Sequence, residues 1–293
     1  MITRACISIN NRCNLNCTYC HFHTPEKAKH LVDDNMDVYM ILDNIKHHID
    51  KYDIQVFKLG FVGNGEPLLD YDALRNYVMY ISDCLADGSI SAYTITNGTL
   101  VSKEMLSFFK SHKVNVGFSI DGIPDIHDRY RCGTHNEVMN AIKLYHSIHG
   151  EYPSMNCTVG RDTLDRADQT IAFFEPFRSR ITFSRMIGSD GITLDEFHVF
   201  LEKAMQKLNV RTGGYDCTMY GGMCGAGINN IFYANNKIYL CGNCVDLPAI
   251  ADASFPLDGI NPNLPLFDRK KCYKETRPVS YTHLRAHETD SYL

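Results

Sequence analysis

Residues 13–20, CNLNCTYC, place three cysteines on one short segment with the spacing C-x-x-x-C-x-x-C. The segment comes directly after residues 5–9, an apolar run that predicts a buried strand. Three thiolates at this spacing can bind three irons of a four-iron, four-sulfur cluster. The fourth iron then has no protein ligand, and such an open position lets a metal centre bind a second molecule directly. We therefore predict that Cys13, Cys17 and Cys20 are cluster ligands.

The spacing leaves other interpretations of this segment open. Zinc prefers four ligands, and His21 or His23 could complete a zinc site with the three cysteines. A coincidental grouping of cysteines is a further alternative. A cluster that only transfers electrons fits less well, because such a cluster usually has a fourth cysteine nearby.

Cysteine usage as a whole supports a metal or cluster role. The chain has 293 residues and twelve cysteines, and its N-terminus lacks the pattern of a signal peptide. A disulfide framework is therefore not expected. Two groups of cysteines stand out, at residues 13–20 and 217–244. Four other cysteines lie in apolar patterns and are predicted to be small core residues: Cys6, Cys84, Cys132 and Cys157.

Composition excludes several functional classes. The net charge is −5 and no basic block is present, so binding to nucleic acid through its phosphates is not expected. The sequence has no run of 18 apolar residues, so no transmembrane helix and no membrane partner are expected. A hydrophobic fraction of 44% is ordinary for a globular protein. These features predict a cytoplasmic globular chain.

The apolar pattern alternates between strand and helix along the first 210 residues. Strands are predicted at residues 5–9, 56–62, 92–96, 114–120, 155–159 and 181–184. Helices are predicted at residues 36–52, 71–86, 103–110, 136–149, 166–174 and 193–208. The last helix begins with Thr193 and Glu196 at the spacing of a capping box. Six such repeats predict an α/β fold with a parallel sheet, and they suit a partial (β/α)6 barrel better than a full eight-unit barrel.

The chain changes character after residue 210. Residues 1–210 are predicted to form the barrel, and residues 211–277 a smaller glycine-rich region. Within that region, Asn235 and Asn236 separate two alternating segments and predict a β-hairpin, because Asn tolerates a positive φ. Residues 278–293 are set apart, since they resemble a translation of sequencing-adapter DNA. The native protein is then expected to continue past about residue 277; a genuine disordered terminus is the alternative.

Several motifs in chain order resemble those of the radical SAM superfamily. The cysteine segment resembles its cluster loop. Residues 63–67, GNGEP, resemble its GGEP motif, with Asn64 in place of a glycine. Residues 96–99, TNGT, resemble the turn after the third strand. Residues 119–122, SIDG, and residues 127–131, HDRYR, resemble a segment of the peptide- and protein-modifying branch, which includes the anaerobic sulfatase-maturating enzymes.

The resemblance implies a fold and two cofactors. The fold would be a partial barrel of radical SAM type with a small C-terminal auxiliary region similar to a SPASM or twitch domain. The cofactors would be a [4Fe-4S] cluster and S-adenosylmethionine (SAM), with the amino and carboxylate groups of SAM on the open iron. The residues expected to contact SAM are Tyr19 at the adenine, Gly63, Gly65 and Glu66 at the ammonium group, Ser119 at the ribose, and Arg131 at the carboxylate.

Each of these contacts also has a purely structural interpretation. The GNGEP segment could be a simple strand-to-helix turn, Tyr19 could pack under its loop, and Arg131 could form a surface ion pair. Asp121 is expected to cap its own turn. In the functional interpretation, an external donor such as flavodoxin or ferredoxin supplies an electron. SAM is then cleaved to methionine and a 5′-deoxyadenosyl radical, which abstracts hydrogen from a peptide or protein.

A second set of cysteines flanks the predicted hairpin, with one further cysteine beyond it: Cys217, Cys224, Cys241, Cys244 and Cys272. Soft thiolates at the ends of a hairpin suit an auxiliary [4Fe-4S] cluster. The surroundings of two of them resemble the entry to a SPASM or twitch domain. The fourth ligand stays open between Cys244, Cys272 and a residue beyond this sequence. A zinc ribbon-like site or reduced core thiols are the alternatives.

The residue after Cys241 bears on the substrate. The sulfatase-maturating enzymes have an Asp at the equivalent position, where it acts as a base, but Gly242 stands here and Asp246 lies too far along. Formylglycine formation is therefore doubtful, and modification of a ribosomal peptide is at least as consistent with the motifs. A radical SAM enzyme acting on a small molecule and a non-catalytic iron–sulfur protein are the two alternatives.

Overall fold

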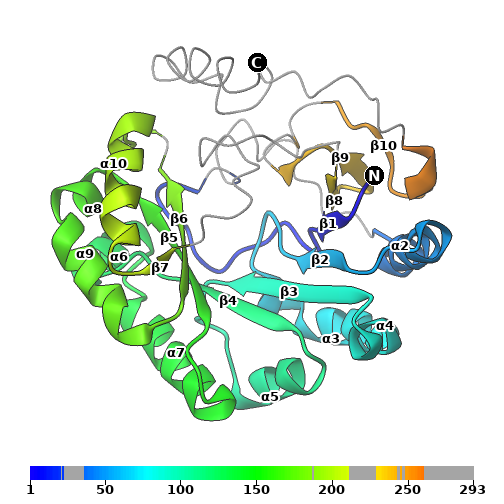
Figure 1. Ribbon diagram of the computed structural model, residues 1–293, viewed down its shortest axis with the longest axis horizontal. Helices are drawn as coiled ribbons and strands as arrows, with labels where there is room; N and C mark the ends of the chain where they lie inside the picture. Colours follow the sequence, from blue (N-terminus) through cyan, green and yellow to red (C-terminus); the bar gives the residue numbers. More distant parts are fainter. Residues whose placement is uncertain are drawn as a thin grey trace.

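The computed structural model describes residues 1–20, 22, 36–186, 188–210, 229–242, 245 and 248–260. Within these residues the strands form a single sheet in the order β10-β9-β8-β1-β2-β3-β4-β5-β6-β7. The sheet curves, and the helices lie along its outer side (Figure 1). The described part of the chain therefore has an α/β partial barrel fold, as predicted.

The six predicted strands are all present and pair in parallel. They are β1 (Arg4–Ile7), β2 (Phe57–Phe61), β3 (Ile90–Thr96), β4 (Asn115–Ser119), β5 (Ser154–Val159) and β6 (Arg180–Arg185). Alternate residues of β3 are buried, as expected of a strand with one face on helices and the other toward the barrel interior. Parallel pairing brings all six carboxyl ends to one edge, which is where α/β barrels place their sites.

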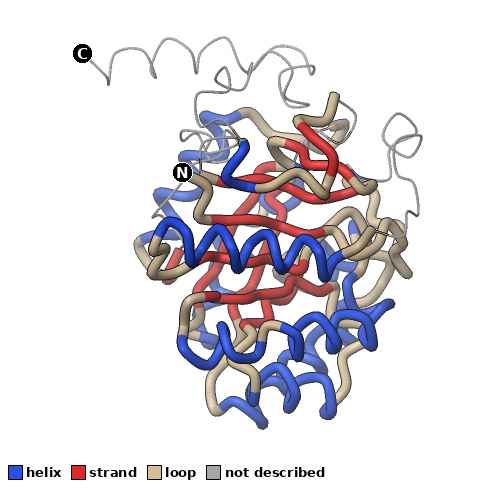
Figure 2. The backbone as a smooth tube through the Cα atoms, turned by 90° about the vertical axis from the view of Figure 1, so that its right-hand side faces the viewer, coloured by secondary structure: helices blue, strands red, loops and turns tan. Residues whose placement is uncertain are grey.

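Helices cover the outer face of the sheet between the strands (Figure 2). They are α2 (Val38–Tyr52), α3 (Tyr71–Tyr80), α4 (Ser82–Asp87), α5 (Lys103–Ser111), α6 (Pro124–Tyr130), α7 (His135–His149), α8 (Arg161–Asp165), α9 (Ala167–Phe174) and α10 (Leu194–Met205). The helix predicted at 71–86 is divided at Ile81 into α3 and α4. The capping box at the start of α10 is confirmed, because the side chains of Thr193 and Glu196 each accept a hydrogen bond from the backbone N–H of the other residue.

The predicted hairpin is also present and joins the barrel sheet. It consists of β8 (Asn230–Ala234) and β9 (Lys237–Tyr239), and Asn235 and Asn236 between them have φ values of 51° and 55°. Positive φ at both turn residues is the geometry of the tight turn that was predicted. β8 pairs in parallel with β1, with Ile231 opposite Ala5, a pairing that the sequence did not predict. Two short strands complete the sheet: β7 (Asn209–Val210) and β10 (Ala251–Asp252).

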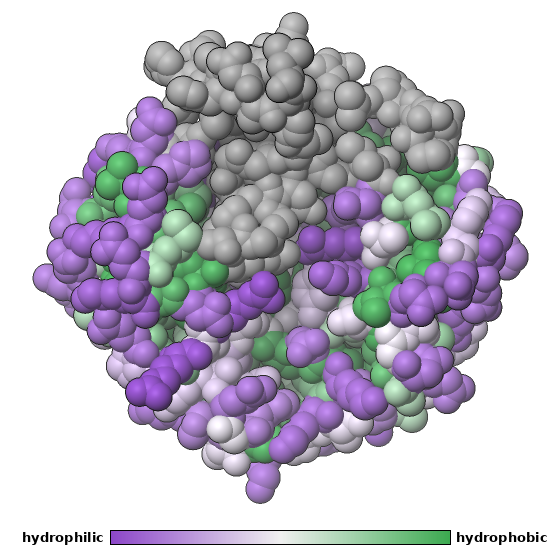
Figure 3. Space-filling model, in the orientation of Figure 1, coloured by the Kyte–Doolittle hydropathy of each residue, from purple (hydrophilic) through white to green (hydrophobic). Residues whose placement is uncertain are grey.

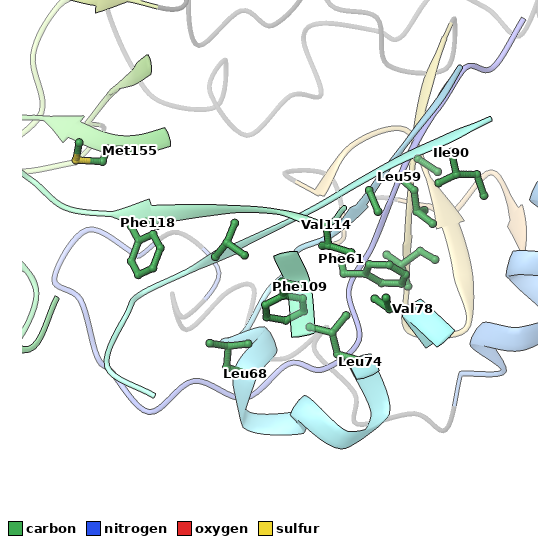
Figure 4. Close-up of a cluster of buried hydrophobic side chains, with 14 of the residues drawn as sticks. Leu59, Phe61, Leu68, Leu74, Val78, Ile90, Phe109, Val114, Phe118 and Met155 are labelled. Carbon is green, nitrogen blue, oxygen red and sulfur yellow. The ribbon is translucent and has the colours of Figure 1, made fainter. Parts of the chain in front are cut away.

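Buried aromatic and aliphatic side chains fill the layer between the sheet and the helices (Figure 4). Phe109 on α5 is fully buried, and its ring meets those of Tyr71 and Phe108 at 5.9 and 5.8 Å. Short 3-10 turns connect the elements at η2 (Pro67–Asp70), η3 (Glu175–Phe177) and η6 (Leu257–Gly259). The aromatic contacts tie α5 to the start of α3.

The four cysteines predicted as core residues have different outcomes. Cys157 is buried, and Cys6 and Cys84 are partly buried. The prediction for Cys132 was wrong, because this residue is exposed and has a φ of 60°. It follows α6 in a left-handed turn that directs the chain toward α7, so local backbone geometry outweighed its apolar character.

Hydrophilic side chains cover most of the described surface on the face in Figure 3. No helix among the described residues is both long enough and apolar enough to cross a membrane.

Substituting Phe109→Ala should lower the free energy of unfolding by about 3–5 kcal/mol, because it removes a fully buried ring and leaves a cavity. The matched control is Val199→Ala on α10, where the side chain is 65% exposed and the change should stay within about 0.5 kcal/mol. Denaturant unfolding under anaerobic conditions measures both. Equal losses in the two variants would contradict the assignment of the core.

Candidate active site

A cavity of about 530 Å³ opens at the carboxyl ends of the barrel strands. The cysteine segment, residues at or after the ends of β2 to β6, Arg131 after α6 and Phe232 of β8 (Asn230–Ala234) are all in its lining. It is lined by every residue predicted for the cluster and SAM: Cys13, Cys17, Tyr19, Cys20, Gly63, Gly65, Glu66, Ser119 and Arg131. The fold thus brings four separate stretches of the chain, at residues 13–20, 63–66, 119 and 131, to one place.

The glycines after β2 are needed for packing against the N-terminal segment. A Cβ on Gly63 would lie 2.7 Å from the Cα of Ser8, and one on Gly65 would collide with the carbonyl of Arg12 and the side chain of Asn10. The resemblance gave these glycines a role at the ammonium group of SAM. The structure adds a packing reason, because their missing side chains make room for the chain that leads into the cysteine loop.

Glu66 fastens the second and third strand ends together. Its carboxylate is 3% exposed and accepts hydrogen bonds from the hydroxyl of Thr96 at 2.8 Å and from the backbone N–H groups of Asn97 at 2.7 Å and Leu68 at 3.1 Å. Burial raises the pKa of Glu66, while these donors favour the ionised form. Its own backbone N–H donates to the carbonyl of Arg12 at 2.7 Å. Glu66 therefore joins three loops of the site.

Further hydrogen bonds fix the first half of the cysteine loop. The amide of Asn14 donates to the hydroxyl of Thr99 at 2.8 Å, and the amide of Asn97 donates to Asn14 at 2.9 Å. The Sγ atom of Cys13 accepts from the backbone N–H of Leu15 at 3.4 Å and faces the amide of Asn97 at 3.9 Å. The turn of residues 96–99 thus holds the loop by side-chain contacts.

The donor set fits the cluster that the spacing predicts. Three thiols line the same cavity, and thiolate is the ligand that iron–sulfur clusters take from proteins. Burial raises the pKa of Cys13, and it raises that of Cys17 to about 12, so a metal must displace a proton from each. N–H groups directed at the sulfur of Cys13 suit a ligating thiolate.

A zinc site would need a fourth ligand beside the three cysteines. His21 and His23, which could have completed a zinc site, lie outside the described residues.

The second half of the cysteine loop contacts a buried ion pair. The hydroxyl of Tyr19 donates to Asp121 at 2.5 Å, and Nε of Arg131 donates to the same carboxylate at 2.8 Å. The guanidinium of Arg131 lies 5.4 Å from the centre of the Tyr19 ring. The surface ion pair considered for Arg131 was wrong, because the pair is buried. Asp121 does more than cap its turn.

Polar and apolar side chains both line the cavity. Ser119 is one of a group of polar residues in or just after β4 to β6, together with Asn156, Thr158 and Ser184. Apolar side chains also line it: Phe232 of β8, Val62 just after β2 and Ile95 of β3. Sequence reasoning missed the roles of Asn97, Asn156 and Phe232. The signal for Asn97 was its position directly after β3, but nothing in the sequence marked Asn156 or Phe232 as part of the site.

The structure describes only one member of the second cysteine group, Cys241. Cys241 follows β9 and is partly buried. Cys217, Cys224, Cys244 and Cys272 lie outside the described residues, as does Asp246. Gly242 packs against the ring of Phe232, so that a Cβ there would lie 2.9 Å from the ring. A larger residue at this position would have to displace a side chain that lines the cavity.

Comparison with known proteins settles the family. Residues 7–174, more than half of the chain, match the Radical SAM superfamily. The chain belongs to the radical SAM superfamily. The family and class of enzyme that the motifs indicated are confirmed, and the matched residues carry the cysteine loop, Glu66, Ser119 and Arg131.

Two curated relatives are similar to part of the chain. A cysteine-type anaerobic sulfatase-maturating enzyme of Clostridium novyi is 27% identical over 172 residues, which are 57% of this chain and 46% of the relative. The radical SAM cyclopropyl synthase TigE of Paramaledivibacter caminithermalis is 26% identical over 180 residues, 57% of this chain and 37% of the relative. The matches span less than half of each of these relatives.

Solved structures share the fold over most of the chain. Native anSMEcpe with bound AdoMet has a TM-score of 0.69 at 18% identity, covering 90% of this chain and 82% of that one. SuiB of Streptococcus suis bound to the precursor peptide SuiA has a TM-score of 0.71 at 14% identity, covering 91% and 66%. At these identities the likeness concerns the fold alone.

Substituting Gly65→Ala should reduce the iron that the protein retains after anaerobic reconstitution, because the new Cβ would push Arg12 and the cysteine loop out of place. It should also lower the free energy of unfolding by about 1–3 kcal/mol. Gly150→Ala is the control: its φ is 82° and nothing lies within 4 Å of its Cβ position, so it adds backbone strain remote from the site. Iron and protein assays on both variants measure the effect, and full iron content in Gly65→Ala would contradict it.

Proposed function

We propose that this chain binds a [4Fe-4S] cluster through Cys13, Cys17 and Cys20 and cleaves SAM beside it to start a radical reaction. The observation that carries the proposal is that the three thiols and the family's motif residues line one cavity at the carboxyl ends of the barrel strands. Three thiolates leave one iron without a protein ligand. When bound, the cluster and SAM together supply a 5′-deoxyadenosyl radical that abstracts a hydrogen atom.

The residues of the chain orient SAM and keep water away from it. The guanidinium of Arg131 binds the SAM carboxylate with its two terminal nitrogens, because only Nε is used by Asp121. Ser119 meets the ribose, the backbone from Gly63 to Gly65 accepts from the ammonium group, and Tyr19 lies at the adenine. Glu66 contributes by holding these loops, since its oxygens already accept three hydrogen bonds.

Apolar side chains in the cavity lining help to exclude water from the reaction. Phe232 and Met186 are 6% and 2% exposed, and both line the cavity with Val62. Apolar surface there keeps a radical from reacting with solvent. Asn156 and the other polar lining residues offer hydrogen bonds to a substrate.

A peptide or protein is the substrate class that the relatives favour. The Clostridium novyi relative is a sulfatase-maturating enzyme by name, and the similarly folded SuiB was solved with its precursor peptide. Gly242 stands where those maturating enzymes have an Asp, so we propose a reaction on a ribosomal peptide rather than formylglycine formation. We further propose that flavodoxin or ferredoxin is the electron donor.

A small-molecule substrate is the second candidate. It is favoured by the match to GTP 3′,8-cyclase of Desulforamulus reducens, which is 30% identical over 141 residues, 47% of this chain. An assay with a peptide substrate distinguishes the two candidates. The peptide is one encoded by a gene next to that of this protein, and it is synthesised with deuterium in its side chains. Transfer of deuterium into 5′-deoxyadenosine would support the peptide substrate, and the absence of transfer with uncoupled SAM cleavage would favour the small molecule.

An auxiliary [4Fe-4S] cluster completes the proposal. We assign its ligands to Cys217, Cys224 and Cys241, with Cys244 or Cys272 as the fourth. Cys241 lies at the end of β9, next to the sheet that carries the cavity. Iron counts near eight per chain, instead of four, would support it.

The variant Cys17→Ala should lose SAM cleavage, because one iron loses its thiolate and the cluster no longer assembles with three ligands. Anaerobically reconstituted protein is treated with dithionite and SAM, and 5′-deoxyadenosine is measured by chromatography. Wild-type protein should form it. A wild-type protein with a reducible cluster and no product would instead identify an electron-transfer protein.

The control for this experiment is Cys84→Ala. Cys84 is partly buried and packs against the hydrophobic core on the outer side of the sheet. Its substitution should leave turnover nearly unchanged. Retained cleavage in Cys17→Ala would show that this thiol is not a ligand.

A further inference from the structure

Asp121 lies directly behind the wall of the cavity rather than in it. It follows β4, its side chain is completely buried, and it is not part of the cavity lining. One oxygen accepts from the Tyr19 hydroxyl at 2.5 Å and from Nε of Arg131 at 2.8 Å, and the other accepts from the backbone N–H of Thr158 at 2.8 Å. All three donor residues line the cavity.

The three donors come from three parts of the chain, and SAM can bind only if these parts are correctly positioned relative to one another. Tyr19 stands between two cluster ligands, Arg131 follows α6, and Thr158 is in β5. Because the same carboxylate binds all three, movement of one changes the position of the other two. A buried carboxylate with three donors has a narrow choice of geometry, because an unmade bond would leave a buried charge unsatisfied.

Asp121 also provides the charge that keeps Arg131 inside the protein. Burial by itself lowers the pKa of Arg131, but the charge of Asp121, with smaller contributions from Tyr19, Cys17 and the hydrogen bond to Asp121, raises the pKa above its ordinary value. Binding through Nε leaves the far edge of the guanidinium with no hydrogen bond inside the described residues.

A buried histidine, His127, links the backbone of Asp121 to the backbone of Arg131 through the hydroxyl of Thr134. The backbone N–H of Asp121 donates to Nδ1 of His127 at 3.2 Å, and Nε2 of His127 lies 3.2 Å from the hydroxyl of Thr134. That hydroxyl donates to the carbonyl of Arg131 at 2.8 Å. Burial lowers the pKa of His127 to about 4, so the ring is neutral near pH 7 and its Nε2 carries the proton.

The cysteine loop is attached to the same helix by its backbone. The N–H of Thr18 donates to the carbonyl of Tyr130 at 3.0 Å, and the rings of Tyr19 and Tyr130 are 5.9 Å apart. The loop, α6 and Arg131 therefore form one connected unit, and Asp121 is the group that joins the side chains of that unit.

We infer that Asp121 is a positioning residue that sets the guanidinium of Arg131 against the cluster loop and so determines SAM affinity. This inference rests on the proposed function, because it assumes that SAM binds in the cavity. Asp121 acts through Arg131 and Tyr19 and does not touch SAM.

The test is the affinity of the cluster-loaded protein for SAM, measured by anaerobic equilibrium dialysis and expressed per assembled cluster. Asp121→Asn keeps the shape of the side chain but removes the charge, and it should raise the Kd for SAM by roughly 10- to 100-fold while iron content stays that of wild type. Asp125→Asn is the charge-matched control, since this carboxylate is 83% exposed and should leave the Kd unchanged.

A merely structural role predicts another pattern. If Asp121→Asn lowers iron content and melting temperature but has the wild-type Kd per cluster, the inference is overturned. Tyr19→Phe provides a second route if Asp121→Asn does not fold, because it removes only the hydroxyl bound to Asp121; an unchanged Kd in that variant also overturns the inference. Wild-type protein that binds no SAM would refute the proposed function instead.

Discussion

Two buried carboxylates fix the loop that carries the three thiols, and the rest of the site depends on them. Glu66 joins the start of the loop to the ends of β2 and β3, through its own N–H on Arg12 and its oxygens on Thr96 and Asn97. Asp121 joins the other half of the loop, through Tyr19, to the ends of β4 and β5. A metal corner can stay open only if its three ligands are held in place without a fourth, so the loop has to be fixed from outside.

The free-energy cost of burying these two carboxylates is offset because each one accepts hydrogen bonds. Glu66 accepts three hydrogen bonds, and Asp121 accepts three and pairs with Arg131. An isolated buried carboxylate would instead take up a proton or force its loop into solvent. The cavity is lined by both polar and apolar side chains, which suits a reaction that needs hydrogen bonds to a substrate and exclusion of water.

The sequence predicted the architecture well, but it predicted the hydrogen bonds and packing contacts within the site less well. All six barrel strands, the hairpin at Asn235 and the capping box of α10 were predictable, because each follows from local periodicity, turn chemistry or capping. The family motifs located the cavity residues. Three features depend on contacts between residues far apart in the chain, which no local pattern specifies. They are the close packing of Gly65 against Arg12, the parallel pairing of β8 with β1, and the hydrogen bonds that converge on Asp121. Helix α6 did carry a local signal, since Pro124 stands in its first turn.

The central claim is that three cysteines of one loop leave an iron open to SAM. Electron paramagnetic resonance of the anaerobically reconstituted, reduced protein tests it most directly, with spectra recorded before and during titration with SAM. The account predicts a [4Fe-4S] signal that SAM alters, and the loss of that signal in Cys17→Ala. A loop loaded only with zinc, or a cluster signal that SAM leaves unaltered, would contradict it.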